Sequence, residues 1–261
     1  MRLTVDRLGH LGDGVGQGPE GPVFVAGVLP GEVVEGTLYG DHLMDPKIVT
    51  PSTDRVKPPC RHARACGGCQ LQHAADPFVA AWKQQVVQTA LAGQGLTAEF
   101  RPIVTSPTRT RRRATLSGRR TKGGVLLGFH GKGSDVITEI PDCQLLHPAL
   151  IAGFPGLEAL VALGGSRTTE LALMVTVTRG GVDVVVTGGK PLDSALRLEL
   201  ARLVEAHGFS RLTWEGETVA LRDRPSQSIG RATVVPPAGA FLQATAEGEA
   251  ALLAGVRVAL G

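Results

Sequence analysis

Aromatic side chains are scarce in this sequence: they make up 4% of its 261 residues, with a single tyrosine. Extended platforms of stacked bases are therefore not expected, and any nucleic acid would be held mainly through phosphate and shape contacts. Apolar runs of membrane-spanning length are also missing, as is a basic stretch followed by an apolar one at the N-terminus. These absences exclude a membrane helix and a secretory signal, so we expect a cytoplasmic protein. A hydrophobic content of 43% still predicts packed cores.

Acidic residues are absent between Glu99 and Asp135. Nine basic residues fall in that stretch: Arg101, Arg109, Arg111, Arg112, Arg113, Arg119, Arg120, Lys122 and Lys132. Removing these nine from the 27 Lys and Arg residues leaves 18, against 24 Asp and Glu, so the rest of the chain is acidic. Positive charge that nothing nearby neutralises favours a phosphate-bearing partner. The alternatives are a solvated arginine-rich face without a ligand, or single arginines that point inward and pair with Asp142 or Glu139.

Cysteine is also rare, yet three of the four cysteines crowd into "CRHARACGGCQLQH", as Cys60, Cys66 and Cys69. In a reducing compartment such a cluster indicates metal ligands, with Cys143 as the fourth thiolate, and Gly67 and Gly68 would let the backbone curl around the metal. Ligand type alone fits an iron-sulfur cluster or zinc equally. Two alternatives stay open. His73 can replace Cys143 in a zinc site, or all four cysteines can be unligated thiols.

The chain divides into five segments with different patterns. Residues 1–55 show short alternating strands and glycine-rich turns, which predict a small antiparallel barrel. In it, Gly14, Gly16 and Gly18 are interpreted as tight-turn residues, because no helix follows to make a phosphate loop. Residues 56–75 form the cysteine loop, and 76–98 hold an amphipathic helix that needs a packing partner. The remaining segments are 99–237, an α+β domain without βαβ repeats, and 238–261, a strand leading into an apolar helix.

Within 99–237 the pattern predicts individual elements. Hairpins are expected at 112–120 with 123–130, and at 171–178 with 182–188. Helices are expected at 147–164, interrupted at Pro155, and at 191–208, with Gly208 beyond the helical residues.

This order of features resembles the RNA 5-methyluridine (uracil-C5) methyltransferases, in the branch that carries a 4Fe-4S cluster and modifies 23S ribosomal RNA. "GDGVGQGPEGPVFVAGVLPGEVV" is similar to the signature of that family's N-terminal TRAM domain, an OB-like barrel. "CRHARACGGCQLQH" matches the family's cluster motif, C-x5-C-G-G-C-x-x-Q-H, at every fixed position. Cys143 stands in a matching "DC" segment, and residues 111–114 echo the family's "RRRA" strand. The resemblance implies a 4Fe-4S cluster on Cys60, Cys66, Cys69 and Cys143, and favours it over zinc.

The resemblance also implies a role for the last segment. In the family an F-x-Q-x-N segment opens a Rossmann-like catalytic domain, and the Gln of this segment contacts S-adenosylmethionine. Phe241 and Gln243 match the segment. Thr245 stands where the family commonly has Asn, and it can still cap the helix that follows. The catalytic Cys and the carboxylate base would lie in a domain that this chain lacks, and the helix at 76–98 would pack on that domain. The fold class implied is α+β multidomain: barrel, iron-sulfur loop, central RNA-binding domain and the first elements of a truncated methyltransferase domain.

Two hypotheses follow. In the first, the chain is part of an RNA methyltransferase that forms 5-methyluridine. Its expected partner is 23S ribosomal RNA, and no DNA or membrane partner is expected. The chain itself would hold no catalytic residue and would not turn over substrate. In the second, it is a stand-alone RNA-binding module clipped by zinc or an iron-sulfur cluster. We expect a monomer. A complete module should bury 78–91 and 241–260 within itself, whereas a fragment should expose an apolar patch and aggregate. In both, the residues expected to contact RNA are Arg109, Arg111, Arg112, Arg113, Arg119, Arg120, Lys122 and Lys132.

Overall fold

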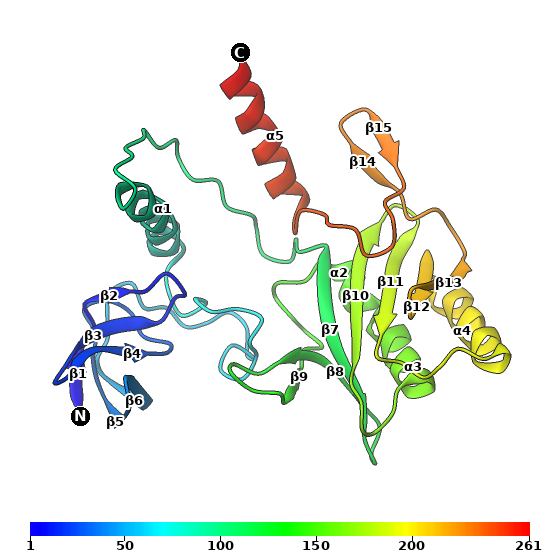
Figure 1. Ribbon diagram of the computed structural model, residues 1–261, viewed down its shortest axis with the longest axis horizontal. Helices are drawn as coiled ribbons and strands as arrows, with labels where there is room; N and C mark the ends of the chain where they lie inside the picture. The colour runs from blue at the N-terminus through cyan, green and yellow to red at the C-terminus, as the bar shows by residue number, and fades with distance from the viewer. The chain divides into compact units, whose positions relative to one another are not determined.

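A computed structural model describes all 261 residues, which form two compact units. The first unit contains residues 1–63 and 69–105; the second contains 64–68 and 106–261. The cysteine loop is therefore divided, because residues 64–68 belong to the second unit while the loop residues on either side belong to the first. Figure 1 shows the elements of both units.

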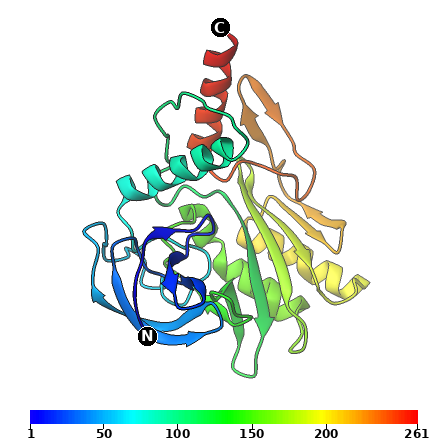
Figure 2. The ribbon, with the colours of Figure 1, turned by 60° about the vertical axis from the view of Figure 1, so that its left-hand side comes forward.

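The first unit begins with a six-stranded sheet that curls into a half-barrel (Figure 2). Its strands are β1 (Arg2–Thr4), β2 (Arg7–Leu8), β3 (Gly14–Gly18), β4 (Gly21–Val25), β5 (Val33–Tyr39) and β6 (His42–Thr50), in the order β1-β5-β6-β4-β3-β2. All neighbours pair antiparallel except β4 and β6. Short alternating strands and an apolar interior confirm part of the prediction for this segment: the sheet is a half-barrel with one parallel pair, where a closed antiparallel barrel was expected.

Three glycines of the half-barrel have a different role from the predicted one. Gly14, Gly16 and Gly18 lie in β3 at every second position, so they point to one face, and none has a positive φ. A Cβ atom at Gly16 would lie 2.4 Å from the backbone oxygen of Thr4, and one at Gly14 would lie 2.4 Å from Val28. The interpretation as turn residues was therefore wrong: these glycines allow neighbouring chain segments to approach closely inside the curled sheet.

Helix α1 (Asp76–Ala92) completes the first unit. Only its first half packs on the half-barrel, where Phe78, Val79 and Trp82 adjoin a small cluster formed by Leu8, Leu29 and Ala74. No residue of α1 is fully buried, and Val87 in its second half is half exposed. Much of the apolar face that the sequence predicted is therefore uncovered within this unit.

The second unit is built on a seven-stranded mixed sheet in the order β13-β12-β11-β10-β7-β8-β9. The strands are β7 (Arg113–Arg120), β8 (Val125–His130), β9 (Ile137–Glu139), β10 (Leu171–Thr178), β11 (Gly181–Thr187), β12 (Arg211–Trp214) and β13 (Glu217–Leu221). Both predicted hairpins, β7–β8 and β10–β11, are confirmed. One parallel pair, β11 with β12, is joined through α4 (Ser194–His207), so the unit contains a single βαβ connection that the sequence did not predict.

Helices α2 (Pro148–Ala152), α3 (Phe154–Gly164) and α4 cover one face of this sheet (Figure 1). The predicted helix break is confirmed, one or two residues early, at Gly153. Asp193 caps α4 by accepting from the Leu196 N–H at 2.7 Å, and Gly208 takes the left-handed conformation after it, with φ of 67°. A large apolar core, which includes Leu116, Leu173 and Trp214, lies between these helices and the sheet.

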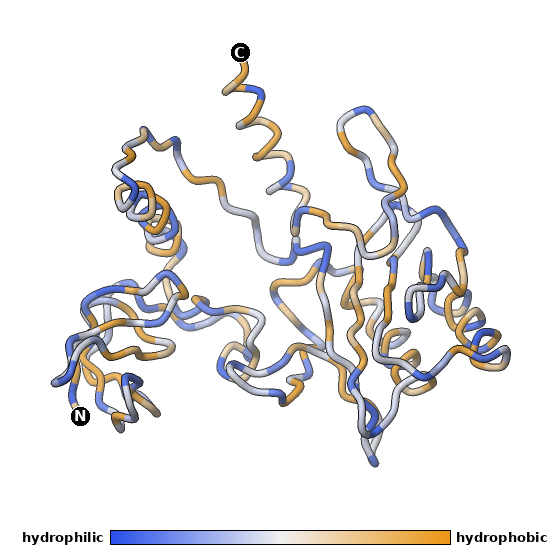
Figure 3. The backbone as a smooth tube through the Cα atoms, viewed as in Figure 1, coloured by the Kyte–Doolittle hydropathy of each residue, from blue (hydrophilic) through white to orange (hydrophobic).

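The remaining elements follow the sheet. Strands β14 (Gln227–Ile229) and β15 (Ala232–Val234) form a separate two-stranded ribbon. The chain then crosses the face of the sheet that the helices leave open, where the buried Arg211 donates to the Pro236 carbonyl at 3.2 Å. Helix α5 (Ala246–Leu260) ends the chain, carries a largely apolar sequence and has no buried residue (Figure 3).

Candidate functional sites

Two of the four cysteines lie in the core of the second unit. Cys66 and Cys143 are each 8% exposed and belong to the same buried cluster. Each sulfur accepts a backbone N–H from the residue two positions later: Gly68 to Cys66 Sγ at 3.3 Å, and Leu145 to Cys143 Sγ at 3.4 Å. A thiolate accepts such bonds well, and N–H···S bonds to ligand sulfurs tune an iron-sulfur centre. The environment of both sulfurs therefore fits metal-ligating thiolates.

The segment around Cys66 is fixed by an extra piece of strand pairing. Cys66 pairs with Gly131 just beyond β8, and the Gly67 N–H donates to the His130 carbonyl at 2.8 Å. A Cβ atom on Gly67 would lie 2.8 Å from that carbonyl oxygen, and one on Gly68 would lie 2.9 Å from the Phe129 ring. Neither glycine has a positive φ. They are needed for close packing against β8, which differs from the curling role predicted for them.

The other two cysteines, Cys60 and Cys69, belong to the first unit. Cys60 is buried, and its N–H donates to the Gln72 side chain at 3.3 Å. Within either unit, no three side chains of histidine, cysteine, aspartate or glutamate gather closely enough to hold a metal ion. Because two cysteines belong to each unit, the four-cysteine site remains a prediction, and so does the alternative with His73.

The segment before β7 brings the arginine-rich motif into contact with the residues that follow Cys143. The Arg109 N–H donates to the Gln144 carbonyl at 3.0 Å, and its side-chain Nε donates to the Gln144 amide oxygen at 3.1 Å. Arg111 forms a short parallel bridge with Leu146. The arginine-rich segment thus holds the stretch that directly follows Cys143.

Arg112 does not point toward solvent. Its backbone N–H donates to the Ala244 carbonyl at 2.8 Å, and its side-chain Nε donates to the Gln243 carbonyl at 3.2 Å. Its guanidinium also forms an ion pair with Glu249 on α5, and only 12% of the side chain is exposed. Arg113 lies over the Phe241 ring, 5.7 Å from its centre. Both arginines therefore hold the Phe241–Gln243 segment, a role that was not predicted for them.

Three of the other predicted RNA contacts are unpaired cations at the far end of β7, whereas Lys132 lies toward the Arg113 end, because β8 runs antiparallel to β7. Arg119 and Arg120 end the strand and Lys122 follows in the turn, and no carboxylate lies within ion-pair distance of any of them; the same holds for Lys132 after β8. At about 3.3 Å per residue, the eight-residue strand separates Arg113 from Arg120 by roughly 23 Å. The basic stretch of the sequence is thus two clusters at opposite ends of one strand.

Thr245 performs the capping role expected of it. Its Oγ1 accepts from the Gly248 N–H at 3.0 Å at the start of α5, and lies 2.6 Å from the Ser106 hydroxyl. Gln243 is partly exposed next to the strongly exposed Phe241. Gln243, the predicted S-adenosylmethionine contact, thus lies in a segment whose carbonyls are bonded by Arg112 and which leads into the Thr245 cap of α5.

One buried charged pair was not singled out from the sequence. Glu32 has no exposed surface; its carboxylate accepts from Arg55 Nε and Nη2 at 2.5 and 2.7 Å, and from the N–H groups of Leu29 and Ser52 at 2.8 and 3.1 Å. Burial raises the pKa of Glu32, but the bonds from Arg55 and the two backbone N–H groups outweigh it and leave the pKa lowered. The pair ties the segment after β6 to the turn before β5, a structural role.

Comparison with known proteins gives relatives along the whole chain. An uncharacterized RNA methyltransferase of Brucella suis is 37% identical over 260 residues, which are 100% of this chain and 63% of the relative. A 23S rRNA (uracil(1939)-C(5))-methyltransferase of Aromatoleum aromaticum is 33% identical over 220 residues, 78% of this chain and 50% of the relative. The chain is homologous to RNA uracil-C5 methyltransferases. No protein-family model matches it.

A solved structure shares the fold of this homologue. The tRNA (uracil-54, C5)-methyltransferase of Pyrococcus abyssi, in complex with S-adenosyl-L-homocysteine, superposes with a TM-score of 0.69 over 98% of this chain and 64% of that one, at 18% identity. The curled half-barrel and the mixed sheet therefore match part of such an enzyme. The chain spans less than two thirds of the length of these relatives. None of its helices combines the length and apolar character needed to cross a lipid bilayer.

Proposed function

We propose that this chain supplies the RNA-binding and iron-sulfur part of an S-adenosylmethionine-dependent methyltransferase that forms 5-methyluridine in 23S ribosomal RNA. The observation that carries the proposal is the 37% identity along the entire chain to a protein named as an RNA methyltransferase. The relative from Aromatoleum aromaticum supports ribosomal RNA as the substrate. The likeness to the tRNA enzyme is one of fold, so transfer RNA is the second candidate.

Cys60, Cys66, Cys69 and Cys143 would hold the 4Fe-4S cluster. The two buried sulfurs that accept backbone N–H groups support this assignment, because such bonds suit thiolates. When bound, the cluster would fix the cysteine loop rather than take part in methyl transfer. Since all four thiols of the chain would then be ligands, none remains to attack carbon six of a uracil. We expect no methyl transfer to RNA by this chain alone, and turnover by it would contradict the assignment.

RNA binding should depend on the free cations rather than on the paired ones. Replacing Arg119, Arg120 and Lys122 by Ala should weaken RNA binding and lower the slope of log K against log salt by about 0.7 to 0.9 for each phosphate that these side chains no longer neutralise. Arg112→Ala is the matched control: its guanidinium is held by Glu249 and the Gln243 carbonyl, so its removal should leave the slope unchanged. Fluorescence anisotropy with a labelled ribosomal RNA fragment at several salt concentrations measures both quantities. If all variants showed the same slope of log K against log salt, Arg119, Arg120 and Lys122 would not contact RNA and would be solvated surface residues.

The uncovered helix α5 favours the enzyme part over a stand-alone module. Leu252, Val256 and Leu260 recur every four residues, so they share a face, and they are 57%, 54% and 83% exposed. An independent module would bury such a face. We propose that it packs on the catalytic domain, as does the uncovered face of α1.

The purified chain should therefore self-associate as its concentration rises. Replacing Leu252 and Val256 by Glu should abolish this association, whereas Ala250→Glu, at an exposed position of the same helix, should not. Multi-angle light scattering gives the mass of each species. A wild-type chain that stays monomeric at all concentrations would favour the stand-alone module.

A further inference from the structure

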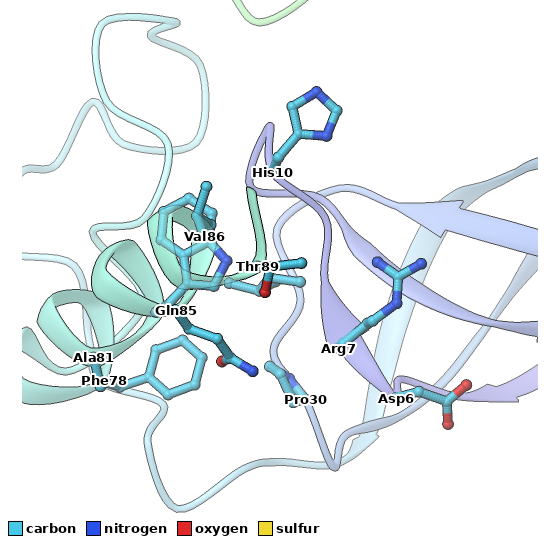
Figure 4. Close-up of a pocket in the computed structure, with 11 residues that line it drawn as sticks. Asp6, Arg7, His10, Pro30, Phe78, Ala81, Gln85, Val86 and Thr89 are labelled. Atoms are coloured by element: carbon cyan, nitrogen blue, oxygen red, sulfur yellow. The ribbon is translucent and has the colours of Figure 1, made fainter. Parts of the chain in front are cut away.

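A cavity of about 620 Å³ lies within the first unit, between α1 and the β2 region of the half-barrel (Figure 4). The helix contributes Phe78, Ala81, Trp82, Gln85, Val86 and Thr89, spaced by three or four residues and therefore on one face. The half-barrel contributes Asp6, Arg7, Leu8, His10 and Pro30. This helix face is distinct from the one that carries Val87.

The lining of the cavity is not that of an incomplete hydrophobic core. The helix packs on the half-barrel near Phe78 and Trp82 and leaves open space farther along, beside Gln85 and Thr89. Arg7 and His10 are exposed side chains on the opposite wall, and no ion pair engages Arg7. Aromatic rings, an amide, a hydroxyl, the Arg7 guanidinium, the His10 imidazole and the Asp6 carboxylate thus surround one space that water reaches.

We propose that this cavity takes up a single unstacked nucleotide of the RNA, an inference that rests on the RNA-binding function proposed above. Proteins read single-stranded RNA by stacking splayed bases on aromatic rings, bonding their edges and neutralising the backbone. Here the rings of Phe78 and Trp82 offer the stacking surface, the Gln85 amide can pair with a base edge, and Arg7 and His10 can meet the phosphate. The volume lies in the range of about 300 to 1,000 Å³ found for small-molecule sites.

The low aromatic content of the chain is compatible with a single base-stacking site, which needs only one or two rings. Extended stacking platforms were not expected from the sequence, and the structure places two of the chain's few large rings at one cavity. Phosphate contacts on β7 would supply the electrostatic part of the affinity, and the cavity would add a base contact.

The two tryptophans of the chain make the test direct. Trp214 is fully buried, whereas Trp82 lines the cavity, so a base that stacks there should quench Trp82 alone. Titrating the full chain with oligouridylate should quench its tryptophan fluorescence, and Trp82→Phe should abolish that signal while anisotropy still reports RNA binding. Trp82→Ala should weaken binding about tenfold, because stacking of one base is worth about 1 to 3 kcal/mol. An abasic oligonucleotide of equal charge should bind more weakly and quench nothing.

A pair of arginine variants separates the cavity from general charge. Arg7→Gln should weaken oligouridylate binding and lower the salt slope by about 0.7, whereas Arg2→Gln, on β1 and outside the cavity, should do neither. RNA binding with unchanged tryptophan fluorescence, or with equal affinity for the abasic oligomer, would overturn the cavity assignment and leave the proposed function standing. A chain that binds no RNA by anisotropy would overturn both.

Discussion

Glu32→Gln should lower the free energy of unfolding of the first unit by about 3 kcal/mol. The substitution keeps the size of the side chain but removes the charge that faces Arg55, and it replaces one carboxylate acceptor with a donor. Breaking a buried ion pair by changing one partner costs about 3 to 5 kcal/mol. The lower end applies here because the Arg55 side chain is 20% exposed and water can partly compensate for the missing charge. Urea unfolding followed by circular dichroism measures the change.

The control for this variant is Glu35→Gln. Glu35 is an exposed residue of β5 that lies 3.9 Å from Arg2, and an exposed pair of that kind contributes at most about 1 kcal/mol. We expect its removal to leave the unfolding midpoint almost unchanged. Equal effects of the two variants would show that the buried pair contributes nothing beyond an ordinary surface charge.

The same residue predicts how stability depends on pH. Because the pKa of Glu32 in the folded chain lies below its ordinary value of 4.5, its contribution is fully present above pH 4.5 and is lost as the pH falls through the lowered pKa. The wild-type chain should therefore lose its advantage over Glu32→Gln in that acid range. If the difference between the two proteins stayed constant with pH down to denaturation, the carboxylate would not be the source of the stability.

Local patterns of the sequence predicted the elements better than the roles of single residues. Alternation and turn chemistry located both hairpins of the large sheet, and Gly208 ends α4 as predicted, whereas α4 begins at Ser194 after the Asp193 cap, three residues later than predicted. The glycines of β3 and of the cysteine loop were assigned to turns, because spacing alone does not show what a Cβ atom would meet. Only the neighbouring strand reveals the close approach at Gly16.

Contacts between residues far apart in the sequence explain the remaining differences. Arg112 was interpreted as an RNA contact because no acidic residue lies near it along the chain, yet Glu249 neutralises it from 137 positions away. The cavity of the first unit likewise depends on how α1 lies on the half-barrel, which no helical period can show. Of the cations at the other end of β7, exposed Lys122 could be predicted, since exposure in a strand turn is a local property, whereas Arg119 and Arg120 are half-buried strand residues.

The cysteines carry the other large expected effect. Anaerobically purified chain should contain about four iron atoms and four acid-labile sulfides, as a 4Fe-4S cluster requires. Cys143→Ser should lose most of both, because a three-thiolate site retains such a cluster poorly, and visible absorbance should fall with them. The Leu145 N–H donates to Cys143 Sγ, and a serine hydroxyl at this position can accept the same hydrogen bond. Cys143→Ser should therefore remove the metal ligand while leaving the local fold intact.

His73→Gln distinguishes the two metal assignments. In the four-cysteine site the histidine is not a ligand, so this variant should keep its iron and sulfide while Cys143→Ser loses them. In the zinc site made by Cys60, Cys66, Cys69 and His73 the outcomes are reversed: the purified chain holds zinc, His73→Gln loses it and Cys143→Ser keeps it. Cys143 belongs only to the iron-sulfur site and His73 only to the zinc site. Metal analysis of both variants therefore distinguishes the two sites even if one variant folds less stably. If both His73→Gln and Cys143→Ser kept their full metal content, neither the four-cysteine site nor the zinc site would be correct.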